Sequence, residues 1–428
     1  MEEEKEQKIK EKLIYYSREI KRDVGNLVKW LFLAAVVGCV TGAASTLFSF
    51  ALKGVTAYRK ANEWIFLLLP VMGLIIVFLY EKIGKEDGGT NQVLSTVRSQ
   101  DDVPLLSAPL IFISTALTHL AGGSAGREGA AIQLGGSIAN QLGRWIHLDE
   151  EDRHVIVMCG MSAAFSALFG TPMAAAVFAL EVVSVGVMYY TALMPCMIAS
   201  LIASQFAAGM GVTPESFHVV DIPALSLETG LKMVIVAVGC AVVSIIFCMV
   251  LNAVAGLYAK WLKNPYIRVV VGACLVIAVT LFLRTDEYMG SGAELIAKAV
   301  ETGQADKFAF LWKIILTALT MRAGFRGGEI VPSFCVGATF GCVMGNLLGL
   351  SPSICAACGM AAVFCGVTNC PITSMLIAFE MFGFRGVSFY LIAVSISYAA
   401  SGYYGLYKDQ TIVYSKYKAK YVNRRTRF

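Results

Sequence analysis

Gly122-Gly123-Ser124-Ala125-Gly126-Arg127-Glu128-Gly129 is a glycine-rich segment with a glutamate near its end, and apolar runs flank it at residues 105–120 and 155–187. A charged side chain at the centre of a bilayer costs about 2.5–3.5 kcal/mol, so such residues face a cavity or a partner. Glycine lets the backbone approach a ligand closely, and free N–H groups at the start of a helix attract anions. The segment therefore predicts a glutamate that guards an anion site lined by backbone N–H groups.

The composition indicates an integral membrane protein. Hydrophobic residues make up 57% of the 428 positions and charged residues only 15%, whereas soluble proteins carry about 25% charged residues. The apolar runs continue almost from end to end, so we expect one multi-pass, all-α unit rather than several soluble domains. Several runs are shorter than the roughly 20 residues of a spanning helix, and glycine or proline interrupts them, which is typical of transporters with half-helices.

Charged residues gather at the two ends of the chain. Residues 1–28 predict a cytoplasmic amphipathic helix that lies against the membrane surface. Its apolar stripe consists of Ile9, Leu13, Ile14, Tyr16 and Ile20. Residues 409–428 predict the start of a last helix and a basic tail, and positive charge beside a span marks the cytoplasmic side. We therefore expect both termini in the cytoplasm, and the net charge of +5 requires no nucleic-acid partner.

The twelve cysteines are scattered through apolar segments. Cys355-Ala356-Ala357-Cys358 has the spacing of a metal or redox pair, but no second pair or histidine cluster follows it. We therefore interpret these cysteines as small buried hydrophobes. No motif of a zinc enzyme, a serine hydrolase or a P-loop accompanies the polar residues, so the sequence predicts no metal, no cofactor and no enzymatic activity.

Two parts of the chain resemble each other. Gly160-Met161-Ser162-Ala163-Ala164-Phe165 is similar to the six residues that begin 199 positions later, at Gly359. At the same offset a proline matches a proline, and Glu181 matches Glu380. Such agreement between two apolar segments indicates an internal repeat.

The glycine-rich segment has a counterpart of its own, because Gly327-Gly328-Glu329 lies 201 positions after Gly126-Arg127-Glu128. Repeats of this kind in transporters meet at a substrate site near the middle of the membrane. We therefore divide the chain into a first membrane repeat at 29–211, a connector at 212–228 and a second membrane repeat at 229–408.

Gly126-Arg127-Glu128-Gly129, followed by Ile132-Gln133-Leu134-Gly135-Gly136, resembles the GREGP(x)xQxGG segment of the CLC family of chloride channels and anion/proton antiporters. With the Gly-Met repeat, Gly170-Thr171-Pro172 and Gly327-Gly328-Glu329-Ile330-Val331-Pro332, the resemblance covers residues 88–414. It implies a helical bundle of two repeats with inverted topology and broken half-helices, assembled as a homodimer.

In that family the glutamate of this motif is the gate, and the resemblance assigns this role to Glu128. Its carboxylate would compete with the anion for the central site and would let the anion pass when it is protonated. Convergent helix N-termini supply the donors that such a site needs. The alternative is that Glu128 only pairs with Arg127 or caps a helix.

The departures from the chloride pattern are informative. Where the family has a serine-bearing GSGIP segment, this chain has Asp87-Gly88-Gly89-Thr90-Asn91. Val182 stands where chloride/proton exchangers have an inner glutamate. Glu329 takes the first variable place of the second-half motif GGxFxP, and Ile330 stands where phenylalanine is usual. Together these features resemble the CLC-F branch, the bacterial fluoride/proton antiporters.

That branch gives Glu329 the second role in the transport cycle, because two carboxylates near one site can share a proton. The alternative is a loop glutamate paired with Arg326 or Arg322. The resemblance also implies a set of anion-binding residues: Gly88, Gly89, Thr90, Gly129, Ile330 and Tyr414. Tyr414 fits the family's tyrosine because a serine follows it, and Tyr407 is the second candidate.

Other polar residues have structural interpretations. Glu181 and Glu380 end matched helices, and we expect them to be structural or water-facing rather than proton relays. The arginines are expected to bind helix-terminal carbonyls or carboxylates, and His119 to be a hydrogen-bonded histidine inside the bundle.

The sequence therefore predicts a multi-pass antiporter of a bacterial plasma membrane that exports fluoride in exchange for protons. The alternatives are a chloride/proton antiporter and a passive anion channel of the same family. The missing inner glutamate argues against the first, and retention of Glu128 argues against the second.

Overall fold

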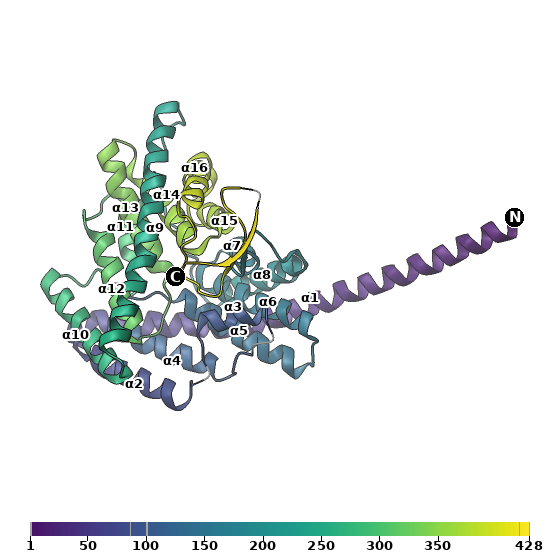
Figure 1. Cartoon of the computed structure of the whole chain (residues 1–428), viewed down its shortest axis with the longest axis horizontal. Helices are drawn as coiled ribbons and strands as arrows, with labels where there is room; N and C mark the ends of the chain where they lie inside the picture. The colour runs from purple at the N-terminus through teal and green to yellow at the C-terminus, as the bar shows by residue number, and fades with distance from the viewer. Residues whose placement is uncertain (1, 86, 100–101, 419, 428) are drawn as a thin grey trace.

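The computed structural model describes residues 2–85, 87–99, 102–418 and 420–427, most of which are helical (Figure 1). The first half contains α1 Glu2–Ala61, α2 Leu69–Lys82, α3 Thr90–Thr96, α4 Ser107–Leu120, α5 Glu128–Trp145, α6 Glu150–Phe169, α7 Pro172–Glu181 and α8 Leu193–Gly209. The second half contains α9 Leu227–Trp261, α10 Pro265–Leu283, α11 Ala293–Glu301, α12 Ala309–Ala323, α13 Ile330–Leu348, α14 Pro352–Thr368, α15 Pro371–Phe382 and α16 Val387–Ala400. Short 3₁₀ turns lie at Glu63–Leu68, Tyr190–Ala192 and Phe384–Gly386.

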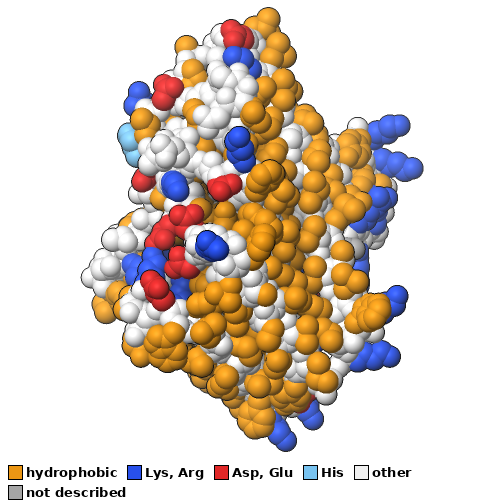
Figure 2. All heavy atoms as spheres, turned by 90° about the vertical axis from the view of Figure 1, so that its left-hand side faces the viewer, with side chains coloured by type: hydrophobic (Ala, Val, Ile, Leu, Met, Phe, Trp, Pro, Cys, Tyr) orange, Lys and Arg blue, Asp and Glu red, His pale blue; other side chains and the backbone are white. Residues whose placement is uncertain are grey.

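The helices divide into long spans and short apolar helices, as predicted. Within the described residues, six helices are long and apolar enough to cross a membrane, while α4, α7, α14 and α15 are apolar but shorter. Prolines start α7 and α15, where the missing N–H costs nothing, and a left-handed Gly170 ends α6. Figure 2 shows a broad hydrophobic surface with Lys and Arg side chains along one edge. The predicted α-helical membrane fold is confirmed.

The two repeats use the same glycine-mediated helix packing. In the first half α5 crosses α6, and a Cβ on Gly160 would meet the carbonyl of Gly135. In the second half α13 crosses α14, and a Cβ on Gly359 would meet the carbonyl of Gly337. Small residues allow such close backbone approach, which in a bilayer provides the packing that holds helices together.

Glu181 and Glu380 hold the two halves together by capping each other's repeat. The carboxylate of Glu181 accepts the backbone N–H groups of Ile372 (3.1 Å) and Thr373 (2.9 Å) in the first turn of α15. The carboxylate of Glu380 accepts those of Met173 and Ala174, each at 2.9 Å, in the first turn of α7. A carboxylate at a helix N-terminus satisfies otherwise unpaired N–H groups and interacts favourably with the helix dipole. These contacts support the structural interpretation.

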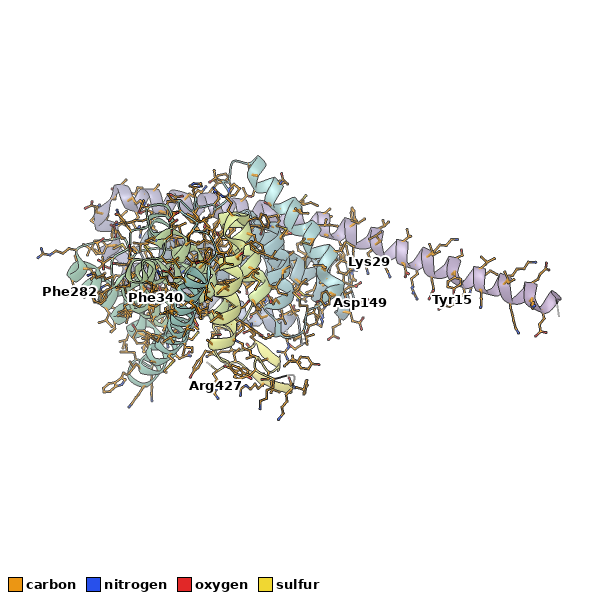
Figure 3. All side chains as sticks on the ribbon, turned by 90° about the horizontal axis from the view of Figure 1, so that it is seen from above. Tyr15, Lys29, Asp149, Phe282, Phe340 and Arg427 are labelled. Carbon is orange, nitrogen blue, oxygen red and sulfur yellow. The ribbon has the colours of Figure 1, made fainter. Side chains whose placement is uncertain are left out.

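The N-terminal segment is helical but is not a separate element. The 60-residue helix α1 continues without a break from Glu2 into the first apolar run, and its N-terminal part stands clear of the body (Figure 1). Figure 3 places Tyr15 on this free part and Lys29 where the helix reaches the body, near Asp149. There Lys29 forms an ion pair with Asp152. Contact of residues 1–28 with a membrane surface stays a prediction, and Met1 lies outside the described residues.

The C-terminal region corrects one prediction, since no helix starts at residue 409. Instead β2 (Thr411–Tyr414) pairs in parallel with β1 (Ser184–Val185) and antiparallel with β3 (Tyr421–Arg425). The residues of β2, Thr-Ile-Val-Tyr, are β-branched or aromatic and favour a strand. The segment that follows α7 offers them an edge to pair with. Residues 419 and 428 of the predicted tail lie outside the described residues.

Replacing Gly160 with valine should destabilise the bundle by about 1–3 kcal/mol, because the added carbons would force α5 and α6 apart. The matched control is Gly256→Val in α9, where a Cβ would meet nothing within 4 Å. Thermal unfolding of the purified protein, followed by the loss of monodisperse material, measures both variants. Equal melting temperatures for the two variants would contradict the packing role of Gly160.

Candidate anion pathway

Two glycines, one from each repeat, join the helix N-termini at the centre of the molecule. The N–H of Gly126 donates to the carbonyl of Gly328, and the N–H of Gly328 donates to the carbonyl of Gly126, both at 2.7 Å. Helix α5 begins two residues after the first glycine, and α13 begins two residues after the second. The internal repeat therefore brings two positive helix ends to one place, where a negative charge is stabilised.

The carboxylate of Glu128 occupies this place. Its side chain is fully buried, and its Oε2 accepts the backbone N–H groups of Arg127 (3.0 Å) and Val331 (3.2 Å). Val331 lies in the first turn of α13, so Glu128 takes a donor that belongs to the other repeat. Its Oε1 is buried without a hydrogen-bond partner among the described residues. An anion at this position would compete for the same N–H groups.

Arg127 lies next to Glu128, but its closer partner is another carboxylate. Its guanidinium forms an ion pair with Glu215 of the connector, and its Nε lies 4.0 Å from the Glu128 carboxylate. The expectation that Arg127 binds a carboxylate is confirmed, but the principal partner is Glu215. Glu128 therefore depends mainly on backbone donors, and it also caps α13 as the alternative interpretation foresaw.

A cavity of about 160 Å³ lies beside the starts of α5 and α13, and most of the predicted site residues line it. The predicted residues that line it are Gly88, Gly89, Thr90, Gly129, Glu329, Ile330 and Tyr407. Thr90 Oγ1 donates to the carbonyl of Gly129 at 3.1 Å, which ties α3 to the first turn of α5. The start of α3, the start of α5 and the start of α13 thus meet around one space.

Tyr414 does not line this cavity. It lies on β2, its side chain is 49% exposed, and its ring contacts that of Tyr421. Tyr407 is only 6% exposed and lines the cavity instead. The choice of Tyr414 rested on a helix that the structure replaces with a strand, so Tyr407, the second candidate, is the tyrosine at the cavity.

Glu329 lies at the cavity and is also paired with an arginine, so both environments considered for it are present. It lines the cavity, and its carboxylate forms an ion pair with Arg322 Nη2 at 3.0 Å. Arg326 is not its partner, because this guanidinium stacks on the ring of Tyr80 at 3.8 Å. Both arginines also line the cavity. The space beside Glu128 is therefore bordered by one glutamate and two cations.

Two further residues lie at the cavity although sequence reasoning gave them no role. Gln133 donates from Nε2 to both carboxylate oxygens of Asp87, at 2.8 and 2.9 Å, and Asp87 also accepts the N–H of Gly89. Asn91 has a buried side-chain oxygen without a partner among the described residues. Gln133 is part of the segment that resembles the GREGP(x)xQxGG motif, and this position in the motif could have indicated that it lies at the site. His119 Nε2 contacts the carbonyl of Gly126 at 3.3 Å, as expected of a bonded histidine.

Comparison with known proteins identifies the family. The family model described as voltage gated chloride channel matches residues 72–402. The chain belongs to this family, the CLC family. A curated CLC relative, the chloride/fluoride channel protein of Pseudomonas syringae pv. tomato, is 34% identical over 400 residues, which cover 91% of this chain and 88% of that protein. The H(+)/Cl(−) exchange transporter ClcA of Vibrio cholerae is 24% identical over 393 residues, covering 82% of this chain and 81% of that one.

Solved CLC structures share the fold. The crystal structure of a CLC-type fluoride/proton antiporter superposes with a TM-score of 0.86 and 33% identity, covering 90% of this chain and 98% of that one. A slow cyanobacterial Cl⁻/H⁺ antiporter superposes with a TM-score of 0.75 at 17% identity, covering 87% and 94%, which shows the fold alone. The higher identity to the first structure and to the Pseudomonas protein assigns the chain to the CLC-F branch.

We expect Tyr407→Phe to lower the apparent affinity for the transported anion by about three- to tenfold, because one hydroxyl hydrogen bond contributes about 0.5–1.5 kcal/mol. Tyr414→Phe is the matched control and should behave like the unmodified protein. Initial rates of anion efflux from proteoliposomes at increasing anion concentration separate the two. A larger effect of the Tyr414 variant would return that residue to the pathway.

Proposed function

We propose that this protein exports fluoride from a bacterial cell in exchange for entering protons, with Glu128 as the gate. The observation that carries the proposal is the position of the Glu128 carboxylate on the first-turn N–H of α13, beside a cavity of about 160 Å³. An anion that is to cross must displace this carboxylate. Protonation would remove its charge and free the N–H groups, which links anion passage to proton binding.

The choice of fluoride over chloride follows from the residues and the relatives together. Fluoride is small and strongly hydrated, so it needs close backbone donors rather than a wide halide pocket, and the start of α3 offers glycine where the chloride pattern has serine. The fluoride/proton antiporter and the chloride/fluoride channel protein are more similar to this chain than the chloride exchangers described above. Val182 replaces the inner glutamate expected of a chloride/proton exchanger.

In this proposal Glu329 assists Glu128 by holding its carboxyl group or a proton–fluoride pair during the cycle. Its carboxylate lines the same cavity, and its ion pair with Arg322 holds the side chain in position. We further propose that the protein acts as a homodimer with one pathway per subunit, that both termini are cytoplasmic, and that the repeats span residues 29–211 and 229–408. It is a transport protein, and we propose no enzymatic step.

Ion efflux tests the proposed function. Proteoliposomes loaded with fluoride or with chloride should release fluoride faster by an order of magnitude or more, with protons moving in the opposite direction. Fluoride-selective and chloride-selective electrodes and an external pH electrode record the three fluxes. Chloride release as fast as fluoride release would exclude fluoride selectivity, and fluoride release without proton uptake would favour a passive channel.

Glu128→Gln should abolish proton uptake, because the amide keeps the shape of the side chain but cannot bind and release the proton. Anion movement in this variant should stop or become independent of pH. Glu228→Gln is the control, since Glu228 is exposed at the start of α9 and forms a local ion pair with Lys232. Fully coupled exchange in the Glu128 variant would remove the gate assignment.

Glu329→Gln should slow turnover by at least about tenfold, which corresponds to about 1.4 kcal/mol in the barrier. Arg322→Gln distinguishes a direct role from a structural one, because it breaks the same ion pair but leaves the carboxylate in place. If Glu329 acts in the cycle, its variant should be slower than the Arg322 variant at every pH. Equal rates in the two variants would reduce Glu329 to a partner of Arg322.

A further inference from the structure

A second cavity, of about 140 Å³, lies beside the other part of the glycine-rich segment. Its lining residues come from the end of α1, from His119 on α4 and from the loop before α11. A third cavity, of about 340 Å³, shares His119, Lys60 and Ser291 with it and reaches Arg127. None of the residues that line these two spaces lines the cavity at Glu329. Arg127 precedes Glu128 and Gly129 follows it, so the gate lies between the two sets of cavities.

Arg59 is a buried cation in this second cavity. Arg59 is only 8% exposed, and its Nη1 has no hydrogen-bond partner among the described residues. No ion pair of Arg59 exists within the described part of the chain. A buried guanidinium nitrogen without a hydrogen-bond partner is costly, because it loses the hydrogen bonds and the screening of water. An anion in the cavity would supply both.

Two glycines shape the space around the Arg59 guanidinium. A Cβ on Gly122 would lie 3.2 Å from Nη1, and a Cβ on Gly290 would lie 3.8 Å from Nη2. Both glycines have positive φ angles, +77° and +62°, which side-chain-bearing residues rarely adopt. The ring of His119 also faces this point, since its Nδ1 would lie 3.9 Å from the same Gly290 Cβ. The backbone thus leaves room on two sides of the cation.

The first turn of α11 adds donors to the cavity. Gly292 and Ala293 line it, and α11 begins at Ala293, so the free N–H groups of this helix start are at the cavity wall. The nearby carboxylates are largely compensated, because Glu294 pairs with Lys60 and Glu287 pairs with Lys298. Asp286 also lines the space and interacts with the Arg59 charge, but it is exposed, so water weakens this interaction.

We propose that Arg59 and the N-terminus of α11 form an outer binding site for a small inorganic anion, and that the transported anion occupies it before or after it passes Glu128. The proposal rests on the proposed transport function. The site concentrates anions next to the third cavity, which Arg127 lines, and thereby raises the rate at which they reach the gate from that face. Its occupant is a monovalent anion of halide size rather than an organic one, because the cavity is small and its charged lining is largely paired. The Arg59 guanidinium and the start of α11 are the donors that remain, and Asp286, Glu287 and Glu294 would repel an anion of higher charge.

Anomalous diffraction from bromide tests the site directly. Bromide is a suitable probe because a guanidinium and helix N–H groups select weakly among halides. Crystals of the full-length protein soaked in bromide should show an anomalous peak within hydrogen-bond distance of the Arg59 guanidinium. Absence of a peak, with only water at Nη1, would overturn the proposal, and this test needs no variant that could fail to fold.

Variants then test whether the site serves transport. Crystals of Arg59→Gln should show no bromide peak at this position. When fluoride is supplied from the side of the membrane that Arg59 faces, the KM should rise by about tenfold and kcat should stay the same, because a charge-assisted contact is lost. Arg59→Lys should restore part of the affinity. Arg284→Gln is the matched control, since Arg284 is an exposed arginine at the end of α10 in the same loop region. A peak that persists in Arg59→Gln would be an adventitious ion only and would overturn the proposal.

The experiments distinguish a failure of the proposed transport function from a failure of the outer site. Bromide at Arg59 in a protein that carries no fluoride would leave the outer site in place and remove the proposed function. Coupled fluoride export with an unchanged KM in Arg59→Gln would leave the function in place and remove the outer site.

Discussion

Two backbone hydrogen bonds between Gly126 and Gly328 fix the distance between the starts of α5 and α13. Both residues use their N–H and C=O groups for this pairing. The two backbone segments approach so closely that a Cβ on Gly328 would lie 2.7 Å from the backbone nitrogen of Gly129. Because the bridge holds the helix ends in place, Glu128 of one repeat reaches the N–H of Val331 in the other. The position of Glu128, the proposed gate, is therefore a property of the junction and not of either repeat.

The short helices create an energetic problem that the buried glutamates address. A helix that ends inside a membrane protein leaves N–H groups without partners, and each unsatisfied group in an apolar environment costs several kcal/mol. Glu181 and Glu380 satisfy such groups at the starts of α15 and α7. Glu128 satisfies one in the same chemical way, but it adjoins a cavity from which an anion can replace it. Capping and the proposed gating thus rest on the same interaction in different surroundings.

The sequence was sufficient for the features that local patterns encode. Apolar runs broken by glycine and proline predicted long and short helices, and the offset between Glu181 and Glu380 revealed the repeat. Glycines around Glu128 and Glu329 indicated where the helix starts meet. The offset did not reveal that the paired glutamates cap each other's helices, because equivalence in sequence does not state which copy contacts which.

Other features depend on contacts that no local pattern records. The strand at Thr411–Tyr414 pairs with residues more than two hundred positions earlier, so its partner could not be foreseen, and the expected helix placed Tyr414 wrongly. Glu329 pairs with Arg322 and not with Arg326, which is closer in sequence, because Arg326 stacks on Tyr80 from another helix. Arg59 gave no signal in the sequence, since an arginine near the end of a long helix is ordinarily exposed.

The reciprocal caps also bear on how such a chain could arise. Glu181 reaches the first turn of α15, and Glu380 reaches the first turn of α7, so the same patch is used twice across the junction. This is the arrangement of an isologous interface, in which two identical subunits exchange equal contacts about a two-fold axis. Two half-length polypeptides with these contacts would complete each other's helix ends as the subunits of an isologous dimer do. The single chain contains such a two-fold contact in its interior.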